Sequence, residues 1–283
     1  MSIDSTWLRC PNCFADLSPV DDRVYGCVQG HRFDRAKHGY LTLLPPKAPR
    51  TIGDDRAMLT ARAELLGQGA YRPIADEVVR AAATDDSELS FGHLRIADLG
   101  CGTGYYAERL AEARPVASLL LADRSPEAVR ASLRAVPAAT GLVLDIWRPL
   151  PLRDAVADVV LDVFAPRNPT EFTRILRPDG RLIVVVPRAG HLRELRDGGM
   201  LLDIPPEKAN AVTGQFAAAG LVRRGAVPIE YGLHADRRTR LLLAGMGPSA
   251  RHSASLGEGT AGEAAEVTIA VDVLTFVHAA STR

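Results

Sequence analysis

The residues with the clearest chemical potential are an aspartate and three glycines that follow a short apolar run. Asp98 is followed at alternate positions by Gly100, Gly102 and Gly104, and Thr103 stands between the last two. Glycines in a turn between a strand and a helix accept positive φ and carry no Cβ, so the backbone can lie directly against a ligand. The pattern predicts that these five residues form a cofactor-binding loop.

The charge of this loop indicates which kind of cofactor it binds. A dinucleotide fingerprint needs G-x-G-x-x-G, and here Tyr105 stands where the last glycine is required. The carboxylate of Asp98 would repel a pyrophosphate, whereas it can pair with an ammonium group. S-Adenosylmethionine carries an ammonium and a sulfonium and no phosphate, so the loop favours this cofactor over a glycine turn without a ligand. The pattern D-x-G-x-G-x-G resembles the first motif of class I methyltransferases.

A second group of residues, near the N-terminus, has the spacing of a metal site. Cys10 and Cys13 form a C-x2-C pair. After thirteen intervening residues, Cys27 and His31 form a C-x3-H pair. Three thiolates and one imidazole fill the four positions of a tetrahedral Zn²⁺ and leave none for water, so the site is predicted to be structural. The less favoured alternative is three buried cysteines beside an unrelated histidine.

The elements around the glycine loop predict a parallel sheet with helices between its strands. The expected strands cover residues 94–99, 117–123, 141–144, 158–164, 181–186, 222–231 and 266–277. The expected helices cover residues 54–66, 73–83, 106–113, 170–176 and 237–244. Right-handed β-α crossovers on either side of the loop give an α/β fold of the class I methyltransferase type. We expect a doubly wound, mostly parallel, seven-stranded sheet with an antiparallel edge strand, next to a small N-terminal zinc-binding domain.

Two further aspartates stand at the ends of expected strands. Asp123 lies 19 residues after Gly104, where a carboxylate can accept both ribose hydroxyls of an adenosine. A helix N-cap is the less favoured role for Asp123, because Ser125 is already placed to cap the next helix. Asp145 is a candidate to bind the exocyclic amine of the adenine, and a solvated turn aspartate is an equally good interpretation.

The N-terminal half of the chain resembles one family more closely. The metal-site spacing is followed by F-D-x-A-K-x-G-Y-x-x-L-L-P from Phe33 to Pro45, and later by G-x-Y-x-P from Gly69 to Pro73. These features look like the 23S ribosomal RNA guanine-N1 methyltransferases, which include macrolide-resistance enzymes of the tylosin and mycinamicin type. The resemblance covers nearly the whole chain.

The resemblance implies a substrate, an assembly and further site residues. It implies methylation of N1 of a guanine in a 23S rRNA hairpin loop by a homodimer, with macrolide resistance as a further role. It also implies a zinc-knuckle RNA-recognition domain over residues 1–46 and a methyltransferase domain over residues 47–283, joined by a proline-rich linker over 47–53. Tyr71 and His191 match family residues that contact the cofactor. The alternatives are that Tyr71 is an aromatic residue packed at the domain edge and that His191 is a surface histidine in a loop.

The loop after the fourth expected strand should face the substrate. It offers Asp162, Arg167 and Asn168. The N1 of a neutral guanine bears a proton that must leave as the methyl group arrives, and Asp162 could accept it. A buried or ion-paired aspartate is the favoured interpretation, so we assign no catalytic residue. The interleaved basic and aromatic residues over 33–40 suit either RNA contacts or a solvated basic face.

Composition limits the remaining alternatives. Lysine plus arginine equals aspartate plus glutamate at 34 each, so the chain has no global basic signature of a nucleic-acid-binding protein. No apolar run approaches the length of a membrane span and no export signal is evident, so a cytoplasmic location is expected. Two other functions remain open: a small-molecule methyltransferase with a structural zinc lid, and a non-catalytic RNA-binding protein with a vestigial cofactor pocket.

Overall fold

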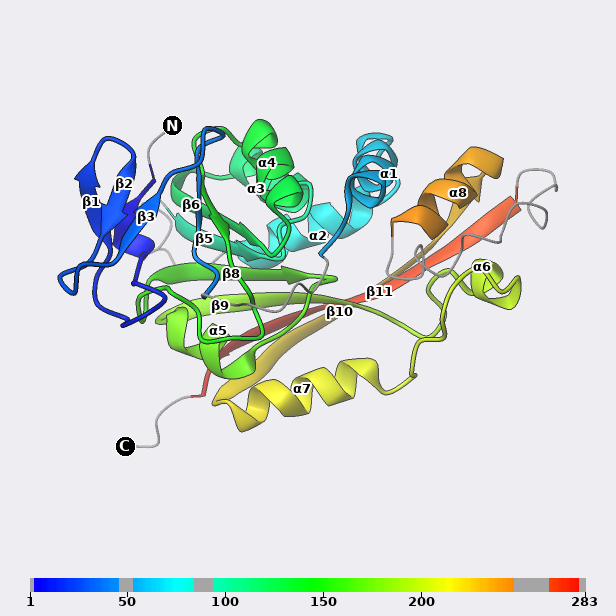
Figure 1. Cartoon of the computed structure of the whole chain (residues 1–283). Coiled ribbons are helices and arrows are strands. Elements are labelled where there is room, and N and C mark those ends of the chain that lie inside the picture. Colours follow the sequence, from blue (N-terminus) through cyan, green and yellow to red (C-terminus); the bar gives the residue numbers. More distant parts are fainter. Residues whose placement is uncertain (1–2, 46–52, 84–93, 247–264, 280–283) are drawn as a thin grey trace.

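An eight-stranded sheet runs through the centre of the molecule (Figure 1). The computed structural model describes residues 3–45, 53–83, 94–246 and 265–279. The order of the strands across the sheet is β10-β11-β9-β8-β5-β6-β7-β4. Their bounds are β4 Tyr40–Thr42, β5 Leu94–Leu99, β6 Val116–Asp123, β7 Thr140–Val143, β8 Ala157–Val163, β9 Leu176–Pro187, β10 Leu221–Ala235 and β11 Ala265–His278. The predicted linker over 47–53 lies, apart from Gly53, outside the described residues.

The pairing of the strands confirms the expected mostly parallel sheet. β5 pairs in parallel with β6 on one side and with β8 on the other, so that Asp98 lies opposite Leu121 and Leu161. β11 is antiparallel to both β9 and β10, and therefore lies one place inside the edge strand β10. The eighth strand, β4, comes from the N-terminal region and pairs in parallel with β7. All seven residues of β8 are buried, as expected for a parallel strand covered on both faces.

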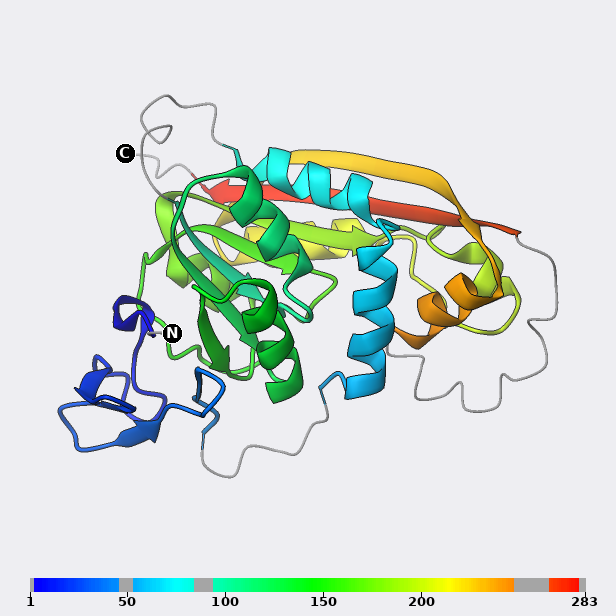
Figure 2. The same ribbon diagram turned by 90° about the horizontal axis from the view of Figure 1, so that it is seen from above.

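Helices cover both faces of the sheet (Figures 1 and 2). One face packs against helices that contribute to a core with β5 and β6; these are α1 Arg56–Gly67, α2 Arg72–Ala82, α3 Tyr105–Ala113, α4 Pro126–Ala135 and α8 Arg237–Gly245. The other face packs against α5 Pro169–Ile175 and α7 Lys208–Ala218. The short helix α6, Arg193–Asp197, follows β9. Because β4 to β9 are parallel to one another, their carboxyl ends lie at one shared edge of the sheet.

The N-terminal segment is tied closely to the sheet. It contains a 3-10 helix, Ser5–Trp7, and a small antiparallel sheet of β1 Ser18–Asp21, β2 Val24–Gly26 and β3 Arg32–Asp34. Trp7 is fully buried, and its indole Nε1 donates to the Ser118 hydroxyl of β6 at 2.7 Å. Leu41 and Leu43 are buried in the same core as α5 and α7. The boundary expected between residues 46 and 47 lies outside the described residues and stays a prediction.

Candidate functional site

The glycine loop after β5 takes a conformation that only small residues tolerate. Gly100 and Gly104 have φ values of +91° and +84°, and Gly104 is the N-cap of α3. A Cβ on Gly100 would lie 2.4 Å from the Cβ of Ala165, and a Cβ on Gly104 would lie 2.8 Å from the backbone of Ser132. The glycines therefore supply both the turn and the close approach of neighbouring segments.

The loop forms one wall of a cavity of about 570 Å³ at the carboxyl edge of the sheet. The cavity is lined by eight of the nine residues predicted to bind the cofactor: Tyr71, Asp98, Gly100, Gly102, Thr103, Asp123, Asp145 and His191. Gly104, the ninth, shapes the loop from behind this wall. These residues come from α1–α2, β5, β6, β7 and β9 and their following loops, so the fold brings them together from distant parts of the sequence.

Two carboxylates lie side by side at the glycine end of the cavity. Asp98 is only 3% exposed, and burial, together with the nearby charge of Asp123, raises its pKa to about 7. The carboxylate of Asp123 accepts hydrogen bonds from the backbone amides of Ser125 at 2.9 Å and Gly102 at 3.1 Å. Burial raises the pKa of Asp123, and these two hydrogen bonds oppose the rise. The helix cap of α4 is supplied by the Ser125 hydroxyl, which leaves Asp123 facing the cavity.

Asp145 is held between arginines rather than in solvent. Its carboxylate forms an ion pair with Arg124 and lies 3.6 Å from Arg148, and it accepts a hydrogen bond from the Trp147 amide at 3.1 Å. Asp145 is 9% exposed, whereas Trp147 is 70% exposed at the cavity. A solvated turn aspartate therefore does not describe it. Arg124 and Trp147 line the cavity but carried no signal in the sequence that marked them as site residues.

An aromatic cluster forms another part of the cavity wall. The Tyr71 hydroxyl lies 3.3 Å from Nε2 of His191, and Nδ1 of that ring accepts the backbone N–H of Ala270 at 3.2 Å. Nε2 of the neutral ring therefore carries the proton and donates a hydrogen bond to the Tyr71 hydroxyl. Burial, with the positive charges of Arg196 and Lys208, lowers the pKa of His191 to about 4, so the ring is neutral.

Phe164 completes this aromatic wall. Its ring centroid lies 6.0 Å from that of Tyr71 and 6.1 Å from that of His191. The backbone of Phe164 has a φ of +55°, a left-handed conformation that is costly for a bulky residue and is concentrated at functional sites. Sequence reasoning missed Phe164, because neither its type nor its position reveals a backbone conformation imposed by the surrounding fold.

Residues at the end of β8 and in the loop that follows it have different roles. Arg167 lines the cavity, whereas Asp162 is fully buried and pairs with it, with Oδ2 3.1 Å from Arg167 Nε. Burial, opposed by the charge of Arg167, raises the pKa of Asp162 to about 8. The amide of Asn168 donates to the carbonyl oxygen of Ile146 at 2.9 Å, and its side chain also caps α5. Asn168 thus holds the loop and is not among the residues that line the cavity.

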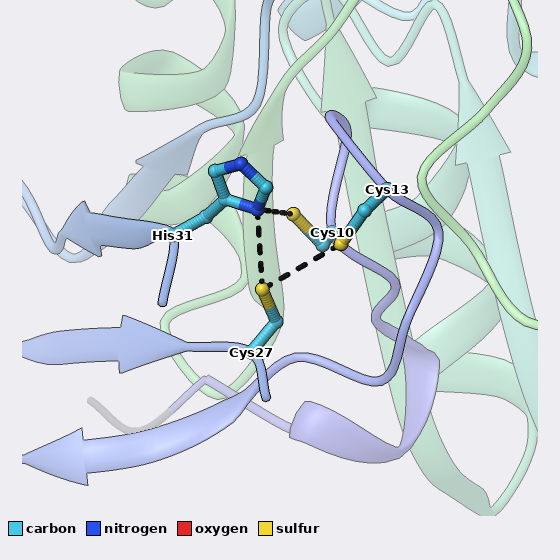
Figure 3. Close-up of side chains that lie close together, drawn as sticks. All are labelled: Cys10, Cys13, Cys27 and His31. Atoms are coloured by element: carbon cyan, nitrogen blue, oxygen red, sulfur yellow. Dashed lines mark hydrogen bonds between the residues drawn. The ribbon is translucent and has the colours of Figure 1, made fainter. Parts of the chain in front are cut away.

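The four predicted metal ligands come together in the N-terminal segment (Figure 3). Their ligand atoms all lie within 4.8 Å of one another. Nδ1 of His31 is 3.3 Å from Cys27 Sγ and 3.5 Å from Cys10 Sγ, and the Sγ atoms of Cys13 and Cys27 are 3.6 Å apart. Sulfur atoms bound to a tetrahedral zinc lie about 3.8 Å apart, as Zn–S bonds of ~2.3 Å require. The donor set and its spacing fit a structural zinc ion.

Comparisons with known proteins match both parts of the chain. The family model described as "RlmA, N-terminal", a zinc ribbon, matches residues 8–51, and the one described as "Methyltransferase domain" matches residues 96–180. The chain is 39% identical to the "23S rRNA (guanine(748)-N(1))-methyltransferase" of Streptomyces fradiae over 254 residues, covering 87% of this chain and 86% of that one. It is also 39% identical to the "Putative 23S rRNA (guanine-N(1)-)-methyltransferase" of Micromonospora griseorubida, covering 87% of each.

The fold alone is shared more widely. The crystal structure of a "putative methyltransferase" from Bacillus halodurans superposes with a TM-score of 0.51 at 13% identity, and the match covers 71% of this chain and 97% of that one. Among the described residues, we find no helix long and apolar enough to cross a membrane.

Proposed function

Because the chain belongs to the family of 23S rRNA (guanine-N1)-methyltransferases, we propose that it transfers a methyl group from S-adenosylmethionine to N1 of a guanine in a 23S rRNA hairpin loop. One observation carries this proposal. A cavity with a carboxylate-led glycine loop and a four-ligand metal cluster occur in one chain, as the resemblance implied.

At the glycine end of the cavity, the carboxylates suit the charges and hydroxyls of the cofactor. We assign the ammonium group to Asp98, because a buried carboxylate is stabilised by an opposite charge. The ribose hydroxyls are assigned to Asp123, whose oxygens still have free lone pairs after accepting two amides. Asp145 is assigned to the adenine amine. Tyr71 and His191, which also line the cavity, are assigned to the methionine end of the cofactor.

For this reaction, the main task of the protein is to position the guanine against the methyl group of the cofactor. S-Adenosylmethionine supplies an electrophilic methyl group on a sulfonium sulfur. The bond from the methyl carbon to sulfur breaks with its electron pair left on sulfur, a bond to guanine N1 forms, and the N1 proton leaves to water. Holding the acceptor nitrogen in line with that bond converts a bimolecular step into an effectively unimolecular one. Because the base comes from a hairpin loop, unstacking it costs less than in a duplex.

The N-terminal segment is proposed to bind the RNA. Zinc fixes its two turns, and Arg32, Lys37 and His38 are exposed nearby. The proposed substrate also implies a cytoplasmic enzyme. Family resemblance supports a homodimer and the two-domain division at residues 46 and 47.

Transfer of a labelled methyl group tests the proposal against its alternatives. The purified protein is incubated with methyl-labelled cofactor and either 23S rRNA or a panel of small acceptors. Label in the rRNA supports the proposal. Label only in small molecules would favour the small-molecule methyltransferase, and cofactor binding without any transfer would favour a vestigial pocket.

We propose macrolide resistance as a further role, because the sequence resembles a family that includes macrolide-resistance enzymes. Deleting the gene should then increase macrolide sensitivity in the host, and unchanged sensitivity would refute this role.

A further inference from the structure

Three basic side chains gather in one part of the cavity, close to His191 and Asp162. Arg167, Arg196 and Lys208 all line it. The guanidinium of Arg196 is engaged by the carbonyl oxygens of His191 and Ala189. Arg167 differs, since its one partner in the described part of the chain is the carboxylate of Asp162. The cavity thus combines buried carboxylates suited to a cationic cofactor with a basic cluster suited to an acceptor group.

The contact between Arg167 and Asp162 leaves hydrogen-bonding capacity unused. Asp162 is fully buried, and the Arg167 side chain is 17% exposed. Asp162 Oδ2 lies 3.1 Å from Arg167 Nε, and the backbone amide of Ala165 also stabilises this carboxylate, but Arg167 Nε makes no well-aligned hydrogen bond among the described residues. The buried side chain of Asp162 therefore packs against the guanidinium and limits where it can lie, while the terminal N–H donors of Arg167 remain available at the cavity wall.

Neighbouring residues indicate that these donors meet a base rather than a phosphate. Phe164 is 38% exposed and Trp147 is 70% exposed, and both line the same cavity. Unpaired RNA bases stack on exposed aromatic rings. Exposed aromatic rings in the same cavity as this guanidinium suit a flat heterocycle with acceptor atoms on its rim.

Resting on the proposed function, we propose that Arg167 binds the Hoogsteen edge of the target guanine, donating to O6 and N7, and that Asp162 is its positioning residue. Guanine presents two acceptors on this edge, which match the fork of an arginine, whereas adenine replaces O6 with an amino donor. N1 lies on the other edge of the base, so this contact leaves it open to the methyl group. As N1 loses its proton, negative charge moves onto O6, where the guanidinium stabilises it.

The test compares RNA hairpins with guanine or 7-deazaguanine at the methylated position, once that position is mapped with unmodified RNA. The wild-type protein should lose about tenfold or more in kcat/KM on the 7-deaza RNA, the size expected from one contact of a bidentate pair. R167Q should lose about ten- to hundredfold on the guanine RNA and should no longer distinguish the two RNAs. R167K keeps the charge but not the fork, so it should retain RNA affinity and lose the discrimination.

Matched controls separate recognition from stability and cofactor binding. Arg134 lies on α4, away from the cavity, and R134Q should behave as wild type. Cofactor affinity by calorimetry should be unchanged in R167Q and R167K. D162N should reduce the discrimination between the two RNAs in the same way, which a merely structural aspartate would not do. If D162N does not fold, the two Arg167 variants still decide the question.

The outcomes for the two proposals are distinct. If wild-type protein does not methylate unmodified RNA, the proposed function fails. If it does, and R167Q keeps the full wild-type discrimination, Arg167 does not read the base and the inference is overturned. A wild-type protein that is indifferent to 7-deazaguanine also overturns it, because no N7 contact then exists.

Discussion

Asp98 links the chemistry of single residues to a measurable pH dependence. Burial and the charge of Asp123 raise its pKa to about 7, so near pH 5.5 the carboxyl is mostly neutral and cannot pair with the cofactor ammonium. We expect cofactor affinity, measured by calorimetry, to fall about tenfold from pH 7 to pH 5.5 in proportion to the ionised fraction. D98N should bind weakly at both values. Equal wild-type affinity at both would show that Asp98 does not bind the ammonium.

The same shift has a consequence for the stability of the protein without cofactor. The folded pKa of Asp98 lies above its ordinary value, so the folded state holds a proton that the unfolded state has released. This contribution to stability is complete below about pH 4 and is lost as the pH rises toward 7. Thermal melting should therefore show D98N gaining stability relative to wild type as the pH is raised across this window, and a constant difference would contradict the assignment.

The sequence alone could identify residues whose functional partners lie close by along the chain. Asp98 and the metal ligands are recognisable because their partners lie within a few positions along the chain. Phe164 and Arg124 could not be found in this way, because a left-handed backbone and an ion pair with Asp145 arise only when distant segments meet. Asp162 could be interpreted as buried and ion-paired, but its partner Arg167 could not be chosen in advance.

At the scale of elements, the metal cluster should hold the N-terminal segment to the sheet. Metal binding supplies folding energy to small segments of this kind, and Trp7 and β4 connect this segment to β6 and β7. Wild-type protein should contain one zinc ion per chain, and C13S should contain less. Proteases should also cleave C13S faster than wild type within residues 8–45. Cys13 is exposed, so the loss is not a packing effect, and V28S at another exposed position is the control. Unchanged zinc content would contradict the ligand assignment.

Most strands and helices were expected within a few residues of their observed bounds, because apolar runs and periodicity reveal them. Two elements show what could not be predicted. A short strand-like run before Pro45 was expected, but its pairing in the sheet was not. β4 has only three residues, and its partners in β7 are about a hundred positions away, so its place in the sheet has no local signal. No element was expected over α7, because only Val212 and Phe216 of this helix are buried and its apolar periodicity is weak. Lys208, at the start of α7, was missed for the same reason.

In the whole molecule, α1 and the residue that ends α8 contribute to the lining of the cavity. Arg62 of α1 forms an ion pair with Asp54 and donates to the carbonyl oxygen of Met246 at 2.6 Å, and all three residues line the cavity. R62A should therefore weaken cofactor binding about tenfold, the loss expected for a charge-assisted pair. Affinity measured by calorimetry checks this, and R134Q serves again as the control. An unchanged affinity would show that this contact does not shape the site.

In the proposed function, one cavity brings a cationic methyl donor together with a guanine of 23S rRNA. The most direct test of this function is nucleoside analysis by mass spectrometry after incubation of the rRNA with the protein and methyl-labelled cofactor. We predict that the label appears in 1-methylguanosine with wild-type protein and is absent with D98N. Label in a different nucleoside, or no label in the RNA at all, would contradict the account.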